Sequence, residues 1–370
     1  MLDLASFPPP RALDALLAHE RIAIFGASAA AAEIEALLAL HGKKVSLYFD
    51  NDSNKHGAPF RERTIYPGAD AVRFTQEGGA IVIAAAFPIE IATKLKHGGA
   101  VMARVFPFVS RMFARHFGRE AIEPYLPHIV WLMTRVADEP SRRYIADLVR
   151  FRWTMDPLAL RPNPCVKGFY AYDHPALGPK PGDHIVDCGA FTGDTARTFL
   201  ERLNGRANIT AVEPLTRNFE ALSGWIKKAH AMDKVSAIHA AIGAARGVVA
   251  IETGETSADP RAHLGGDTGE LTIVETLDAL FAGRYASVDF VKIDIEGQES
   301  AALDGARALI RAAKPDLAIA GYHRPEDLWA IPEQLDAIAP GYALFLGHHP
   351  RAPYECQFFA TARRRVAVAA

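Results

Sequence analysis

The feature that most constrains the fold is an alternation of short apolar runs with helix-forming stretches. From about residue 166, apolar runs such as HIVDC, NITAVEP, KVSAIHAAIG, VDFVKIDIEG and DLAIAGYH alternate with stretches such as TARTFLERL and LTRNFEALSGWIKKAH. Strands alternating with helices predict an α/β fold with a parallel sheet. The last two apolar runs, YALFLGHH and ECQFFATA, have no helix between them, so we expect an antiparallel pair at the sheet edge.

A shorter alternation precedes this one. The strand-like runs RIAIFGAS, KKVSLYFDND and GAIVIAAAF, with the helix-like AAAAEIEALLALHG, predict a small Rossmann-like α/β domain over residues 1–105. Residues 106–165 lose the rhythm and are Arg-rich, and EPSRRYIADLVRFRW within them predicts a helix capped by Ser141. We therefore expect a helical connector over residues 106–165 and a main domain over residues 166–370.

Composition narrows the class of protein. With 49% apolar and 23% charged residues, three scattered cysteines and no apolar run long enough for a membrane span, the chain predicts a cytoplasmic globular protein. Its net charge of −2 hides an acidic main domain, which argues against nucleic acid as a partner. We expect a small hydroxylated acceptor as the partner, and assembly into a homo-oligomer stays open.

The most informative segment is IVDCGAFTGDT, residues 185–195, where an apolar run ends in an acidic residue and a glycine-spaced turn. In an open α/β sheet, ligands bind at the carboxyl ends of the strands. Gly189 would let the backbone approach a ligand closely, and the helix after Gly193 would point its N-terminus at that ligand. The cofactor-binding residues that we expect in this turn are Asp187, Cys188, Gly189, Ala190, Gly193 and Thr195.

A second acidic residue helps to choose the cofactor. Glu213, in AVEP, ends the next predicted strand, where a carboxylate accepts hydrogen bonds from ribose hydroxyls of either NAD or S-adenosylmethionine. A pyrophosphate prefers an uncharged Gly-x-Gly-x-x-Gly loop, whereas this turn carries Asp187 and Asp194, which would repel phosphates. The two carboxylates suit a sulfonium and an ammonium group, so the turn favours S-adenosylmethionine.

The third segment is VDFVKIDIEGQES, residues 288–300. A buried strand should be apolar, yet this one brings Lys292, Asp294 and Glu296 to its carboxyl end. A solvated ion-pair cluster would explain the three charges without any function. Their position at the expected substrate edge of the sheet favours a catalytic role instead.

Together these motifs resemble a known family. VDCGAFTGDT, AVEPLTRNFEAL, ETLDAL, VDFVKIDIEGQE and AIAGYHRPEDLWAIPEQL stand in the order and spacing of FkbM-type methyltransferases, over about residues 166–362. The resemblance implies a class I methyltransferase fold, Rossmann-like, with a seven-stranded sheet that has an antiparallel edge strand. It implies methyl transfer from S-adenosylmethionine to a hydroxyl of a sugar, polysaccharide or related natural product. The residues that it places on the cofactor are Asp187, Gly189, Gly193 and Glu213, with the adenine near Ala240 and Ala241.

An alcohol acceptor must lose its proton as it receives a methyl group, so we expect a base on the acceptor side. Asp294 ends one predicted strand and His323 ends the next, in AIAGYH, so both should face the transferred methyl group. We assign the base to His323 or Asp294, with Glu296 orienting the pair and Lys292 tuning its charge.

Two further chemistries receive less weight. His348 or His349 could join His323 and Asp294 as metal ligands, but adjacent strand residues point to opposite faces, and we expect no metal. Cys188 beside a helix N-terminus could be a nucleophile, but methyl transfer needs no covalent intermediate, so we expect a small buried residue there.

The N-terminal half carries a weaker nucleotide-site pattern. IAIFGASAAAAEI and LYFDNDSNKHG offer one early glycine, an acidic strand end at Asp50 and a loop with Lys55, but no Gly-x-Gly-x-x-Gly. Recognition of a nucleotide sugar and a purely structural role are equally compatible with this pattern. For the whole chain, the functions that compete with methyl transfer are those of an NAD-dependent sugar-nucleotide oxidoreductase and of a non-catalytic nucleotide-binding module.

Overall fold

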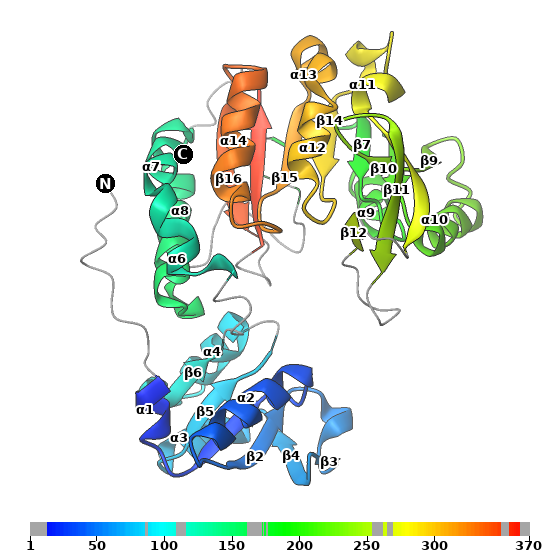
Figure 1. Ribbon diagram of the computed structural model, residues 1–370. Helices are drawn as coiled ribbons and strands as arrows, with labels where there is room; N and C mark the ends of the chain where they lie inside the picture. The colour runs from blue at the N-terminus through cyan, green and yellow to red at the C-terminus, as the bar shows by residue number, and fades with distance from the viewer. Residues whose placement is uncertain are drawn as a thin grey trace. The chain divides into compact units, whose positions relative to one another are not determined.

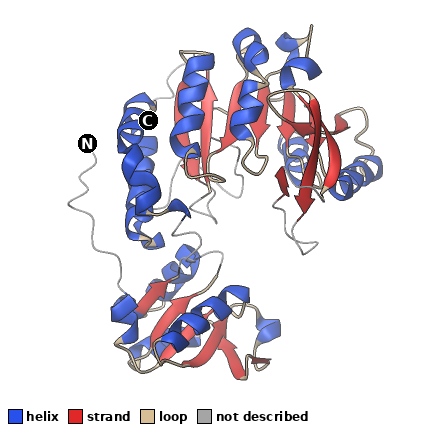
Figure 2. Ribbon diagram, in the orientation of Figure 1, coloured by secondary structure: helices blue, strands red, loops and turns tan. Residues whose placement is uncertain are grey.

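The computed structural model describes residues 13–85, 88–108, 116–160, 172, 174, 177–253, 262–264, 269–348 and 355–362. The chain divides into two compact units, each built of helices and strands (Figures 1 and 2). Unit 1 comprises residues 1–127, 143–162 and 351–353, and unit 2 comprises residues 128–142, 163–350 and 354–370.

Unit 1 contains a six-stranded sheet with the strand order β3-β4-β2-β1-β5-β6. The pairs β4/β2, β2/β1, β1/β5 and β5/β6 are parallel, and only the short β3 is antiparallel to its neighbour β4. The predicted strands and the predicted helix of the N-terminal half all form. The elements are α1 (Leu13–Leu17), β1 (Ile22–Phe25), α2 (Ala29–Leu40), β2 (Val45–Asp50), β3 (Pro59–Phe60), β4 (Arg63–Pro67), α3 (Asp70–Gln76), β5 (Ala80–Ile83), α4 (Pro88–His97) and β6 (Val105–Pro107).

The core of unit 1 has two halves, one on each face of this sheet. Along β1, Ile22 and Ile24 pack with α2, whereas Ala23 and Phe25 pack into the opposite cluster with α3 and α4. Every residue of β1 is buried. A strand covered on both faces must be apolar at every position, which is why RIAIF carries no polar alternation.

Residues 116–154 are helical, with α6 (Arg119–Ile122), α7 (Leu126–Arg135) and α8 (Glu139–Thr154). The prediction that Ser141 caps α8 is wrong, because the helix begins two residues earlier. The Asp138 carboxylate accepts the hydrogen bond from the Ser141 backbone N–H at 3.0 Å. The Ser141 hydroxyl is fully buried and instead accepts from the backbone N–H of Leu346 at 2.9 Å, which fastens α8 to a strand of unit 2.

Unit 2 contains a seven-stranded sheet with the strand order β16-β17-β15-β14-β7-β8-β9. This is the class I methyltransferase fold that the sequence predicts. The predicted antiparallel pair forms, but the antiparallel strand β17 lies one place in from the edge, between β15 and β16. The strands are β7 (His184–Cys188), β8 (Asn208–Glu213), β9 (Val235–His239), β14 (Phe290–Ile293), β15 (Asp316–Ala320), β16 (Ala343–His348) and β17 (Cys356–Thr361).

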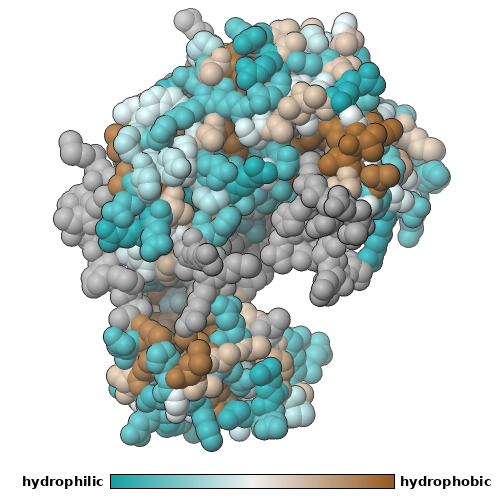
Figure 3. Space-filling view, viewed as in Figure 1, coloured by the Kyte–Doolittle hydropathy of each residue, from teal (hydrophilic) through white to brown (hydrophobic). Residues whose placement is uncertain are grey.

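A second sheet of unit 2 was not predicted. It has the order β10-β13-β11-β12 and consists of β10 (Ala241–Ile242), β11 (Gly247–Thr253), β12 (Ala262–Leu264) and β13 (Glu270–Glu275). Its outer face exposes Val248, Leu271 and Ile273, and Figure 3 shows apolar atoms gathered over this part of the unit. Because apolar side chains lie on both faces of β11, the run GVVAIET lacks the polar alternation that marks a surface strand.

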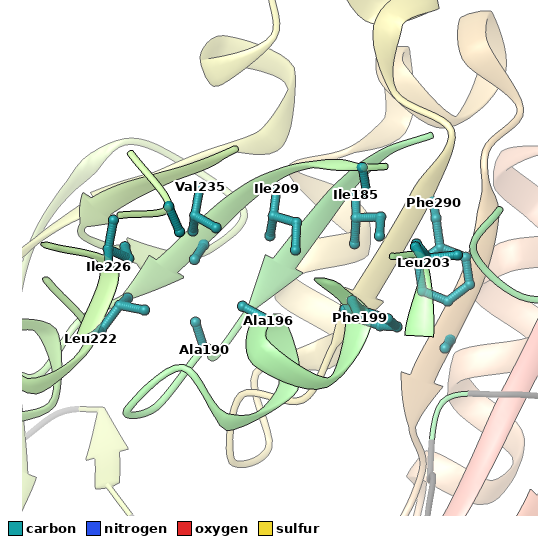
Figure 4. Close-up of a cluster of buried hydrophobic side chains, with 14 of the residues drawn as sticks. Ile185, Ala190, Ala196, Phe199, Leu203, Ile209, Leu222, Ile226, Val235 and Phe290 are labelled. Atoms are coloured by element: carbon teal, nitrogen blue, oxygen red, sulfur yellow. The ribbon is translucent and has the colours of Figure 1, made fainter. Parts of the chain in front are cut away.

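The helices of unit 2 connect successive strands. The main core packs Ile185, Ile209 and Val235 of neighbouring strands against Phe199 of α9 and Leu222 of α10 (Figure 4). The predicted helix over QESAALDGARALIRAA is broken at Gly305, where any side chain would collide with the Gly243 carbonyl oxygen. The helices are α9 (Asp194–Arg202), α10 (Thr216–Lys228), α11 (Leu277–Leu280), α12 (Glu299–Asp304), α13 (Arg307–Ala313) and α14 (Asp327–Ile338). Among the described residues, none of the helices combines the length and apolarity that crossing a bilayer requires.

Candidate active site

The turn after β7 is shaped by two glycines with left-handed backbone. Gly189 has φ +80°, and a Cβ atom there would lie 1.9 Å from the Asp294 carbonyl oxygen. Gly193 has φ +87° at the N-cap of α9, and a Cβ atom there would press on Leu222 and Trp225 at 2.8 Å. The strand ends of β7 and β14 can therefore approach this closely only because residue 189 has no side chain.

Glu213 ends β8 and shapes the opposite wall. Its carboxylate is almost fully buried and accepts hydrogen bonds from the backbone N–H groups of Phe191 at 2.9 Å and Leu215 at 3.1 Å. The Asn218 side-chain amide donates a third bond at 3.1 Å. Burial raises the pKa of Glu213 above its usual value. Three donors hold the carboxylate, and its fourth acceptor position is left for a ligand.

These groups line one pocket of about 230 Å³ at the carboxyl ends of β7, β8 and β14. One side is apolar, and it includes Val212, Ile242 and Ile251. The other side carries the acidic and amide groups of the strand ends. The polar and charged lining residues are Tyr172, Asp194, Thr195, Glu213, Asn218, Lys292, Asp294, Glu296 and Gln298.

Lys292 and Asp187 form an ion pair beneath this pocket. Lys292 Nζ lies 3.0 Å from Asp187 Oδ1, and both side chains are buried. The ammonium also donates to the carbonyl oxygens of Gly189 at 2.7 Å and Cys188 at 3.2 Å. Burial alone would lower the pKa of Lys292, but the charges of Asp187 and Asp294 outweigh it and raise the pKa. Lys292 therefore stays charged and holds the turn against β14.

Asp294 follows β14 and is held by two tyrosines. The Tyr172 hydroxyl donates to Asp294 Oδ2 at 2.5 Å, and the Tyr322 hydroxyl lies 3.4 Å from both carboxylate oxygens. Burial and the charge of Asp294 raise the pKa of both tyrosines. The hydroxyls therefore stay protonated and serve as donors. The Asp294 carboxylate is thus fixed at the pocket wall.

His323 follows β15 and lies among three carboxylates. Its Nδ1 is 2.9 Å from Glu299 Oε1, and its Nε2 is 3.5 Å from both Asp294 Oδ1 and Glu296 Oε2. Burial alone would lower the pKa of His323, but the Glu299 hydrogen bond and the surrounding carboxylates raise it to about 9. Glu296 has φ +55°, a left-handed conformation that is uncommon for a residue with a side chain.

The structure brings most of the sequence-predicted site residues to this pocket. Five others lie outside the pocket lining. Asp187 lies below it, the Cys188 side chain and Ala190 are fully buried, and Gly193 starts α9. His323 contacts the pocket through Asp294 and Glu296. The predicted residues that line the pocket are Gly189, Thr195, Glu213, Ala240, Ala241, Lys292, Asp294 and Glu296.

Three residues at the site have no clear signal in the sequence. Tyr172 lies in a proline-rich stretch without strand or helix periodicity, and Tyr322 precedes the more conspicuous His323. Glu299 is fully buried at the start of α12, and its Oε1 accepts from the backbone N–H groups of Ile295 and Gly297. A glutamate in the first turn of a helix is common, so its position predicts nothing about the site.

The nucleotide-site pattern of unit 1 is filled by the chain itself. Asp50 Oδ2 accepts from the backbone N–H of Ala27 at 3.0 Å and pairs with Lys55 Nζ at 2.9 Å. The strand-end carboxylate that would hold a ribose is therefore already engaged, which favours the structural role for this pattern. Of the two histidines weighed as metal ligands, His348 ends β16, whereas His349 lies outside the described residues.

Comparison with known proteins identifies the domain that carries this pocket. Residues 187–343 match the family model described as the methyltransferase FkbM domain. The chain carries an FkbM methyltransferase domain. The family predicted from the motifs is confirmed, and the protein is a methyltransferase.

Solved structures agree on the fold of this FkbM methyltransferase. The crystal structure of Methyltransferase FkbM from Methylobacillus flagellatus KT is similar, with 19% identity, a TM-score of 0.68 and coverage of 96% of this chain and 94% of that chain. Fibrillarin from Aeropyrum pernix, in complex with natively bound S-adenosyl-L-methionine, matches with 17% identity over 49% of this chain and 67% of that chain. Its TM-score of 0.33 is too low to support an argument. No curated protein matches the sequence significantly.

The cofactor of the FkbM methyltransferase domain is S-adenosylmethionine, and the pocket residues fit it. The apolar wall with Ile242 and Ile251 suits an adenine ring, and the free acceptor position of Glu213 suits a ribose hydroxyl. The acidic strand ends suit a cationic sulfonium centre. When bound, the cofactor supplies an electrophilic methyl group.

Proposed function

We propose that this FkbM methyltransferase methylates a hydroxyl group of a sugar, a polysaccharide or a related natural product. The observation that carries the proposal is the Asp294 carboxylate at the wall of the cofactor pocket, fixed there by Tyr172 and Tyr322. A hydroxyl is a weak nucleophile at neutral pH, so a positioned base should speed its methylation by about 10²–10⁴-fold. Asp294 is placed to accept that proton.

The lining of the pocket supports an acceptor that carries several hydroxyls. Asp194, Asp294 and Glu296 offer carboxylate oxygens, and Gln298 offers an amide oxygen. Carboxylates accept hydrogen bonds from hydroxyls and donate none while ionised. A polyhydroxylated acceptor satisfies such a surface, whereas an anionic acceptor would be repelled by it.

Within this proposal, Asp294 and His323 have different roles. Asp294 lines the pocket, whereas both ring nitrogens of His323 already face carboxylates. We therefore assign the base to Asp294 and a positioning role to His323, with Glu296 beside them. Lys292 holds the turn under the cofactor through Asp187 and the Gly189 carbonyl oxygen.

The proposal is tested on extracts from cells that lack the gene, in which the unmethylated acceptor should accumulate. Adding the purified protein with methyl-labelled S-adenosylmethionine should label a glycan or similar compound, and acid hydrolysis should release an O-methylated sugar or alcohol. Label found only on nitrogen or carbon would contradict a hydroxyl acceptor.

Two variants test the assignment of the base. Asp294→Asn and His323→Ala should each lower turnover by at least about 100-fold, because each disturbs proton transfer. Calorimetry should show binding of S-adenosylhomocysteine within about 1 kcal/mol of wild type, since neither residue holds the nucleotide. The exposed Asp233→Asn is the matched control. Near-normal turnover in both variants would mean that positioning alone drives catalysis.

A further inference from the structure

A metal-binding geometry begins with the orientation of His323. Its Nδ1 lies 2.9 Å from Glu299 Oε1, and that oxygen is held in place by two backbone N–H groups. A carboxylate behind Nδ1 favours the tautomer with the proton on Nδ1. The lone pair of Nε2 then faces the Asp294 and Glu296 carboxylates.

The distances in front of Nε2 fit a shared ion better than direct hydrogen bonds. Nε2 lies 3.5 Å from Asp294 Oδ1 and 3.5 Å from Glu296 Oε2, which is long for a charged hydrogen bond. Ligand atoms that each lie about 2.0–2.2 Å from one metal ion stand about 3–3.5 Å apart. The three atoms are therefore spaced as ligands of one divalent cation.

A second observation comes from Glu299. One ligand atom each of Asp294, Glu299 and His323 lies within 4.8 Å of the others. Glu299 is fully buried, and its Oε2 has no hydrogen-bond partner among the residues that the structure describes. A buried carboxylate oxygen without a donor is costly, and a cation beside it would offset that cost.

The charge of the cluster points the same way. Asp294, Glu296 and Glu299 bring three carboxylates to one imidazole, and the nearby Lys292 is already paired with Asp187. Two carboxylates with one imidazole form a mixed oxygen and nitrogen donor set, which suits Mn²⁺, Fe²⁺ or Zn²⁺ better than Mg²⁺.

We propose that His323 Nε2, Asp294 and Glu296 bind a divalent transition-metal ion, with Glu299 orienting the imidazole from behind. The ion would lie at the pocket wall, because Asp294 and Glu296 line the pocket. Its role rests on the proposed function: a hydroxyl bound to the ion would have a lowered pKa, and its proton would pass to Asp294. Binding of the ion itself does not depend on the identity of the acceptor.

The test uses the full chain after chelator treatment and dialysis, titrated with Mn²⁺ alone and followed by electron paramagnetic resonance of the free ion. We expect one site per chain. His323→Ala and Asp294→Asn should weaken Mn²⁺ binding by tenfold or more, and Glu299→Gln by about 10–100-fold. His128→Ala is the matched control, because His128 also pairs with a carboxylate, that of Glu333 on the surface, and should leave binding unchanged.

Binding of S-adenosylhomocysteine by each variant shows whether its fold is intact. Absence of stoichiometric Mn²⁺ binding to the wild-type chain, or equal binding by wild type and both ligand variants, would overturn the metal site. In the first case His323 simply carries a proton between the carboxylates, and hydroxyl methylation by Asp294 alone still stands. Mn²⁺ binding that the variants abolish supports the site even if the acceptor is not a hydroxyl.

Discussion

Lys292 on β14 and Asp187 on β7 are opposite each other in the register of two parallel strands, and their charged groups lie 3.0 Å apart. Both side chains are buried, and the ammonium also binds the carbonyl oxygens of the cofactor turn. The pair thus joins the strand that precedes the glycine turn to the strand that leads to Asp294. A charge in the middle of an otherwise apolar strand is explained by this contact.

Removal of one partner should therefore be far more costly than removal of both. Lys292→Met leaves Asp187 charged and unpaired in the core, and we expect a loss of about 3–5 kcal/mol in the free energy of unfolding. The double variant with Asp187→Asn should recover part of that loss, because no buried charge remains. Urea unfolding measures both, with the exposed Lys227→Met as control. Equal stabilities of Lys292→Met and wild type would show that the pair is not buried.

The main parts of this site could be predicted because parallel strands meet at one edge. Glu213, Asp294 and His323 each stand at or just after the end of an apolar run, and the sheet gathers such positions. Strand order and direction do the rest. A charged residue at a strand end is a strong signal because the residues before it are apolar.

The contributions of Tyr172 and Glu299 could not be predicted in the same way. Tyr172 reaches Asp294 from a position 122 residues away in the chain and from outside any helix or strand. Glu299 lies in the first turn of α12, where acidic residues are common for reasons of helix electrostatics. Only the folded chain shows that this one is buried against His323.

The close approach of β7 and β14 gives a prediction for Gly189. Gly189→Ala should destabilise the turn and weaken binding of S-adenosylmethionine strongly, because the added Cβ would meet the Asp294 carbonyl oxygen at 1.9 Å. Gly205→Ala is the matched control, because Gly205 also has positive φ but no atom within 4 Å of the added Cβ. It should cost only about 1 kcal/mol of backbone strain. Similar losses of cofactor affinity in the two variants would contradict this explanation.

Glu213 should contribute to affinity for the cofactor. Glu213→Ala removes a buried carboxylate from the pocket wall, and we expect a loss of about 1–3 kcal/mol in binding of S-adenosylhomocysteine. Isothermal titration calorimetry measures the change. Glu220→Gln, on the exposed face of α10, should bind like wild type. Unchanged affinity in the Glu213 variant would remove this residue from the cofactor site.

Cys188 should be chemically inert in the folded protein. Burial, together with the charge of Asp187, raises the pKa of its thiol to about 12. Because the thiolate is the reactive form, and the folded chain binds the proton more tightly, the thiol stays protonated well above neutral pH. At pH 8, iodoacetamide should leave Cys188 unmodified in the native chain and alkylate it in urea, as mass spectrometry of the peptide would show. Rapid alkylation of the native chain would argue for a nucleophilic cysteine at this position.

The last prediction concerns the domain division that we propose, with residues 1–105, 106–165 and 166–370 as separate parts. Every lining residue of the cofactor pocket lies between Tyr172 and Gln298, within unit 2. Unit 1 has its own sheet and its own two-sided core. Removal of residues 1–105 should therefore leave the dissociation constant for S-adenosylmethionine within about twofold, although Leu158 would lose its packing partners in the core of unit 1.

Calorimetry on the truncated chain, with the full chain measured alongside, gives the comparison. The isolated segment 1–105 should also unfold cooperatively, because its buried strands and helices form a complete apolar core. The melting temperature of the truncated chain separates the two causes of a weaker interaction. If that temperature is close to the one for unit 2 in the full chain while cofactor binding is lost, residues 1–105 belong to the cofactor site and the proposed division is wrong.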